Sequence, residues 1–354
     1  MIFTEDSVIL RNHLVHKIKH EKLNELEKLF NFFKKITLNK ISIQRYYSSD
    51  FKSQQIIEST FVSDTIKHES RQLFKKSCLT VTVNSIQFQI NVYSSGEPLS
   101  AFITNLLLYL QFITNITQIN INTVTLNYYL IDQNKVLKDD LKGELSKDEV
   151  NSGSCQRFDS EAIINIWRKE EILKVTIHEL IHAFSFDYIN EGDLKNHYND
   201  KYNLEGIHIN SQEAYTEIWA QLINCFMISQ YTDQDKQYEM FSTMVLLEKD
   251  FSDFQSDKIF NHTNLSNETI NINKETNVLA YYIIKNELYK SLNVFLQFCR
   301  TNNDDYIKII DIEKYQLFLK KRKRDKENDI SLKDTNNHFI LRTMRMSLNE
   351  LQVI

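Results

Sequence analysis

Five consecutive residues, His178-Glu179-Leu180-Ile181-His182, carry the clearest chemical signal in the sequence. Residues four apart lie on one face of an α-helix, so the imidazoles of His178 and His182 can both reach one metal ion, at about 2.0–2.1 Å from each nitrogen. Glu179 lies about 100° around such a helix, beside the ion, where its carboxylate can take a proton from a metal-bound water. The motif therefore predicts a zinc-binding helix that carries its own general base.

A catalytic zinc usually has three protein ligands, so the two histidines leave one ligand to be found. An HExxHxxGxxH motif would supply a third histidine, but Ser185 and Tyr188 stand at the glycine and histidine positions. The next candidates are Glu213 and Glu217, which share one face if Ser211–Ala220 (SQEAYTEIWA) is a helix. The sequence therefore predicts a His-His-Glu site with one of these two carboxylates as the third ligand.

The HELIH motif, followed by a helix with EAYTE, resembles the gluzincins, the thermolysin-like HExxH…E zinc metallopeptidases. The resemblance implies a peptidase with Zn²⁺ as cofactor, in which Glu213 is the third ligand and Glu217 orients a zinc-binding histidine, His178. The reverse assignment stays open, because the residues from Glu217 to Ala220 also resemble the ExxA pattern of other gluzincins. The stretch IWRKEEILKVTIHELIHAF is similar to uncharacterised putative metallopeptidases of giant DNA viruses.

In such a peptidase, a zinc-bound water activated by Glu179 hydrolyses the peptide bond. The resemblance also implies a donor that stabilises the oxyanion, commonly a Tyr or His. The first candidates are Tyr281 and Tyr282, followed by His208 and Tyr215. Two other functions remain as alternatives. One is a non-catalytic binding or virion scaffold protein that keeps the zincin fold. The other is a DNA-associated, crosslink-type protease that holds nucleic acid with the basic run Lys320–Lys326 (KKRKRDK).

Composition limits the remaining choices. The 354 residues carry a net charge of −5, which argues against general binding of nucleic acid, and only 5 Gly and 1 Pro argue against a Gly-rich phosphate loop. The 4 cysteines form no CxxC pair, which argues against a disulfide scaffold or a thiolate zinc knuckle. No apolar signal segment or membrane span is evident. We expect a soluble, intracellular protein, in host cytoplasm or a virion if viral, acting on a peptide or protein substrate.

The spacing of apolar residues predicts an α+β fold: a zincin-like core with a small mixed or antiparallel sheet and the active-site helix, followed by a helical C-terminal subdomain. Alternation predicts two strands within 79–93, which meet at Asn84-Ser85, and further strands at 121–131 and 162–167. The expected helices span 99–116, 168–186, 211–230, 233–260 and 275–300.

We expect four regions along the chain. They are a helical N-terminal region (1–75), a zincin-like α+β subdomain with the HELIH helix (76–190), a helical subdomain with the third zinc ligand (191–310) and a charged C-terminal tail (311–354).

Overall fold

A computed structural model defines the fold of most of the chain. It describes residues 2–17, 23–38, 41–50, 61–137, 145–187, 194–202, 209–263, 276–322 and 335–354. The fold is mixed α+β, which confirms the predicted class. The chain forms two compact units: unit 1 contains Met1–Asn31, Lys135–Val150 and Asp187–Leu351, and unit 2 contains Phe32–Asn134, Asn151–Phe186 and Gln352–Ile354.

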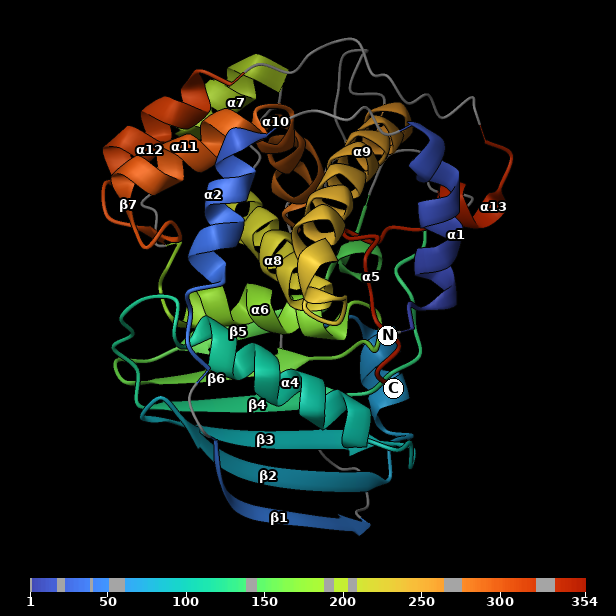
Figure 1. Cartoon of the computed structure of the whole chain (residues 1–354). Helices are drawn as coiled ribbons and strands as arrows, with labels where there is room; N and C mark the ends of the chain where they lie inside the picture. The colour runs from blue at the N-terminus through green and yellow to red at the C-terminus, as the bar shows by residue number, and fades with distance from the viewer. Residues whose placement is uncertain are drawn as a thin grey trace. The chain divides into compact units, whose positions relative to one another are not determined.

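A six-stranded sheet forms the centre of unit 2, with the order β1-β2-β3-β4-β6-β5 (Figure 1). Its strands are β1 (Ser42–Asp50), β2 (Lys75–Val83), β3 (Ile86–Ser94), β4 (Thr123–Tyr129), β5 (Gly153–Arg157) and β6 (Glu161–Ile166). β3, β4 and β6 are parallel to one another, whereas β1–β2, β2–β3 and β5–β6 are antiparallel pairs. The short strand β5 is therefore an antiparallel edge of a mixed sheet.

The strand pair predicted within 79–93 is the hairpin of β2 and β3. Its turn residues, Asn84 and Ser85, have φ angles of 47° and 68°. Left-handed conformations at both central residues are typical of the tight turns that match the twist of a hairpin. Asparagine tolerates this conformation better than most residues, which explains why the chain turns there without glycine.

Two helices, α4 (Ser100–Ile113) and α6 (Ile172–Ala183), pack on the same face of the sheet. Tyr128 of β4 contacts both: its ring meets Phe102 of α4 edge-on at 5.0 Å, and its hydroxyl lies 3.0 Å from Oγ1 of Thr176 in α6. Burial removes the Tyr128 hydroxyl from water and raises its pKa, so the group stays neutral. This contact fixes α6, the helix of the HELIH motif, against the sheet.

The opposite face of the sheet is polar over its middle. A row of amides crosses three parallel strands: Asn91 donates to Asn127 at 2.9 Å, and Asn127 donates to Asn165 at 3.0 Å. One end of this face is apolar, where Tyr93 and Tyr129 stack beside Ile66 of α3 (Asp64–Ser70). The alternation of apolar and polar residues in the strands reflects these two faces.

Unit 1 is mainly helical. Its longer helices are α1 (Glu5–Leu14), α2 (Asn24–Phe33, which ends past the unit boundary), α7 (Leu194–Tyr202), α8 (Gln212–Ser229), α9 (Gln237–Thr263), α11 (Leu292–Asn302) and α12 (Ile312–Lys320). The shorter elements are η1 (Val15–Lys17), α5 (Lys147–Val150), η2 (Gln234–Lys236), the π-helical turn η3 (Leu279–Ile284), α10 (Lys285–Lys290), β7 (Asn303–Asp304), β8 (Lys308–Ile309) and α13 (His338–Arg342).

Residues 343–351, called here the C-terminal segment, are almost entirely buried in unit 1 without forming a helix or an extended strand. Buried side chains elsewhere in unit 1 form hydrogen bonds with the backbone of this segment. Tyr282 and Lys285 donate to the carbonyls of Met344 and Met346, at 2.6 and 3.0 Å. The carboxylate of Glu248 accepts from the backbone N–H groups of Leu348 and Asn349, at 3.2 and 3.1 Å. These bonds replace the partners that regular secondary structure would supply.

Parts of the predicted organisation differ from the structure. Residues 42–50 form β1, not a helix, because every residue of this edge strand is exposed and no apolar alternation marks it. The region 311–354 is not simply a charged tail, since it contains α12, α13 and the buried C-terminal segment. The helix expected at 275–300 is divided into η3, α10 and α11. Both units also combine distant stretches of chain, which the four consecutive regions did not anticipate.

Candidate metal centre

The HELIH motif occupies the C-terminal half of α6. The helix begins after Glu171, whose φ of 59° and ψ of 23° lie in the left-handed region. Its first half, Ile172–Ile177, is almost wholly buried, and the buried Thr176 makes the contact with Tyr128. The helix begins at 172, not at 168 as predicted. Arg168 lies before it, and its guanidinium donates to the carbonyls of Asn151 and Gln133 in the preceding loops.

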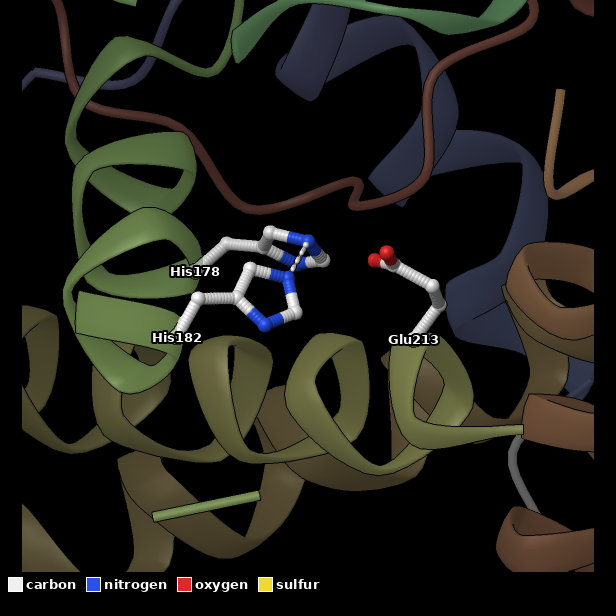
Figure 2. A group of neighbouring side chains, drawn as sticks. All are labelled: His178, His182 and Glu213. Carbon is white, nitrogen blue, oxygen red and sulfur yellow. Dashed lines mark hydrogen bonds between the residues drawn. The ribbon is translucent and has the colours of Figure 1, made fainter. Parts of the chain in front are cut away.

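The two imidazoles of the motif turn their Nε2 atoms toward each other (Figure 2). These atoms lie 3.2 Å apart, and the ring planes are inclined by 80°. Two nitrogens bound to one tetrahedral zinc at about 2.0–2.1 Å would lie roughly 3.3–3.4 Å from each other. The spacing of His178 and His182 is therefore close to that of two ligands of one ion.

Glu179 points to a different side of α6, toward the edge strand β5. Its side chain lies directly against the Cα position of Gly153, where an added Cβ would be 2.9 Å from Cδ of Glu179. Glu179 is 6% exposed. The motif thus places a carboxylate beside the histidine pair, in contact with the backbone of the outermost strand.

Glu213 lies in the first turn of α8 and is mostly buried. Three neutral donors hold its carboxylate: Asn210 and Asn277 bond Oε1 at 3.3 and 3.2 Å, and the Tyr281 hydroxyl bonds Oε2 at 2.9 Å. The positive end of the helix dipole also favours a negative charge in this turn. These three hydrogen bonds orient the carboxylate of Glu213.

Glu217, one turn further along α8, is 1% exposed. Its Oε1 accepts a hydrogen bond from Gln221 at 3.1 Å, and the Gln221 carbonyl oxygen accepts one from the Tyr289 hydroxyl at 2.7 Å. This chain of side chains fixes Glu217 from within unit 1. The two carboxylates that the sequence offered as alternatives therefore have different surroundings.

The two predicted tyrosines also differ in their partners. Both belong to the π-helical turn η3, and π-turns are frequent at functional sites. Tyr281 donates to Glu213, whereas the hydroxyl of the buried Tyr282 donates to the backbone carbonyl of Met344. Tyr281 is thus the member of the pair that lies at the candidate metal centre.

Three residues at the site were missed in the sequence. Asn210 and Asn277 are common polar residues outside any motif, and Asn277 reaches Glu213 across 64 positions of chain. Gly153 is one of only 5 glycines, and that scarcity was the signal that could have drawn attention to it.

Of the basic run Lys320–Lys326, residues 323–326 lie outside the described residues.

Comparison with known proteins adds no family assignment: no protein-family model, curated protein or solved structure matches this chain. Among the described residues, no helix combines the length and the apolar character that a membrane crossing requires.

Proposed function

We propose that this chain is a zinc-dependent peptidase. The observation that carries the proposal is the pair of Nε2 atoms 3.2 Å apart on His178 and His182, with the carboxylate of Glu179 on the neighbouring residue. The proposal assigns His178, His182 and Glu213 to the metal ion as its three protein ligands. Two imidazoles and one carboxylate match the ligand types of catalytic zinc in peptidases.

The donor set fits zinc better than calcium or magnesium, which prefer oxygen ligands. With Zn²⁺ bound, two neutral imidazoles and one carboxylate would give the site a net charge of about +1, and the ion would supply a Lewis acid that makes water acidic near neutral pH. In this assignment Glu213 is the third ligand, and the hydrogen bonds from Asn277 and Tyr281 orient it.

Glu179 carries the proton in the proposed reaction. Its carboxylate accepts a proton from the attacking water and returns it to the leaving amine nitrogen, so the carboxylate is regenerated in each turnover. Because Glu179 is not one of the three assigned ligands, its carboxylate would serve as the general base. The role of Tyr281 as an oxyanion donor stays a prediction, and its bond to Glu213 gives it a second role in orienting that ligand.

The proposal is tested by measuring the metal content of the purified chain by mass spectrometry, together with four variants. We expect about one zinc per chain, retained in Glu179→Gln, lost in His178→Ala and Glu213→Ala, and weakened but present in Glu217→Ala. If Glu217→Ala loses zinc and Glu213→Ala keeps it, the third ligand is Glu217. A chain that takes up no zinc when reconstituted with the metal is not a zinc peptidase.

Activity is tested separately on a peptide library. The zinc-loaded wild-type chain should cleave peptides, and zinc-loaded Glu179→Gln should not, because removal of a general base lowers such rates by about 10²–10⁴-fold or more. A chain that binds zinc but cleaves no peptide would instead support the non-catalytic scaffold function.

A further inference from the structure

Gly153, the first residue of β5, touches the side chain of Glu179. Gly153 pairs with Ile166 of β6, and the following residue, Ser154, pairs with Asn165 of the polar face. A Cβ built on Gly153 would lie 2.9 Å from Cδ and 3.0 Å from Cγ of Glu179, and closer still to Oε1. Real Cβ atoms essentially never approach other heavy atoms this closely, so one of the two residues would have to move.

The backbone conformation of Gly153 does not itself require glycine. Gly96, by contrast, has a φ of 104°, in the region that other residues rarely adopt. Gly153 has no such angle and lies in a regular strand pairing, where glycine is usually unfavourable because it has no side chain to pack and loses much backbone entropy on folding. The contact with Glu179 is therefore the physical reason for glycine at this position.

We infer that Gly153 is a positioning residue for the carboxylate of Glu179, an inference that rests on the proposed function in giving Glu179 the role of general base. The contact involves Cγ and Cδ as well as the terminal oxygen, so rotation of the carboxylate alone cannot relieve an added methyl group. Alanine at this position would move the whole Glu179 side chain or the edge strand. The backbone of β5 at Gly153 thus limits how far the Glu179 side chain extends from α6.

The contact is tested without any assay of activity, by a double-mutant cycle in thermal unfolding. Gly153→Ala should lower the melting temperature by about 2–4 °C when Glu179 is present. In the Glu179→Ala background the added methyl group has room, and the same substitution should leave the melting temperature unchanged or raise it. Ser154→Ala is the matched control, because it changes the next residue of β5 and should shift both backgrounds equally.

The positioning role is tested on the zinc-loaded enzyme. Gly153→Ala should retain one zinc per chain and the wild-type KM, while kcat falls by about 10–100-fold, since a base displaced by about 1 Å loses rate of this order. Equal shifts in melting temperature with and without Glu179 would overturn the contact. An unchanged kcat in Gly153→Ala would overturn the positioning role. A wild-type chain without zinc would refute the proposed function, whereas the thermal cycle would still report on the contact.

Discussion

The hydrogen bond from Tyr281 to Glu213 leads to a quantitative prediction about zinc affinity. Tyr281→Phe removes a donor 2.9 Å from Oε2 and leaves the two amide donors on Oε1 in place. A hydrogen bond to a charged group contributes about 1.5–3 kcal/mol. At about 1.4 kcal/mol for each factor of ten, zinc binding should weaken roughly 10–100-fold. The same range is typical when the partner of a metal ligand is removed.

Competition with a chromophoric zinc chelator measures this affinity directly. Tyr282→Phe is the matched control, because it removes the same group from the next residue of η3 but breaks the bond to the Met344 carbonyl instead. That variant should lose about 1–3 kcal/mol of stability, since it leaves a buried carbonyl unpaired, and should keep its zinc affinity. Equal zinc affinity in wild type and Tyr281→Phe would refute the argument that this hydroxyl orients the ligand. A lower kcat at unchanged affinity would assign the hydroxyl to catalysis alone.

Three further predictions concern stability. Arg168→Met should lower the free energy of unfolding by about 1.5–3 kcal/mol in urea titrations, because it removes the guanidinium donor of the Gln133 carbonyl and leaves the Asn151 carbonyl with Trp167 as a donor; a loss below about 0.5 kcal/mol would contradict this. Asn127→Ala, which interrupts the amide row away from the metal centre, should lower stability by about 1–2 kcal/mol in the same assay without changing zinc content. The hydrogen bond from Arg300 holds the pKa of Glu25 below its ordinary value of 4.5, so the stability that this pair contributes is present above pH 4.5 and is lost as pH falls through the lower pKa of the folded state. Arg300→Leu should therefore lower the melting temperature slightly at pH 7, and the difference from wild type should disappear in strong acid.

Much of the site could be predicted from local spacing. His178, Glu179 and His182 lie within two turns of one helix, and that helix is specified by its own apolar residues. Glu213 could be proposed as a ligand because the helix that contains it, α8, is also recognisable from its own stretch of sequence. The paired strands β2 and β3 were readable because both alternate and because their turn contains Asn84.

The rest depends on contacts between distant residues. Nothing near Tyr281 in the sequence indicates that it contacts Glu213. The sequence also cannot distinguish the two tyrosines, whereas in the structure Tyr281 donates to Glu213 and Tyr282 donates to the Met344 carbonyl. The contact of Gly153 was not predicted, because its neighbour in space, Glu179, is 26 positions later in the chain. β1 was missed for the opposite reason: an exposed edge strand has no buried face to impose a pattern.

The C-terminal segment also determines when unit 1 can form during synthesis. Glu248, Tyr282 and Lys285 are made long before the backbone that they bind, so these hydrogen bonds form only after residues 343–351 leave the ribosome. Unit 2 faces no such delay over residues 32–186, since its sheet and α6 are complete once Phe186 has emerged. A nascent chain would therefore hold a formed HELIH helix for more than 150 residues of translation before η3, with Tyr281, acquires its support from residues 343–351.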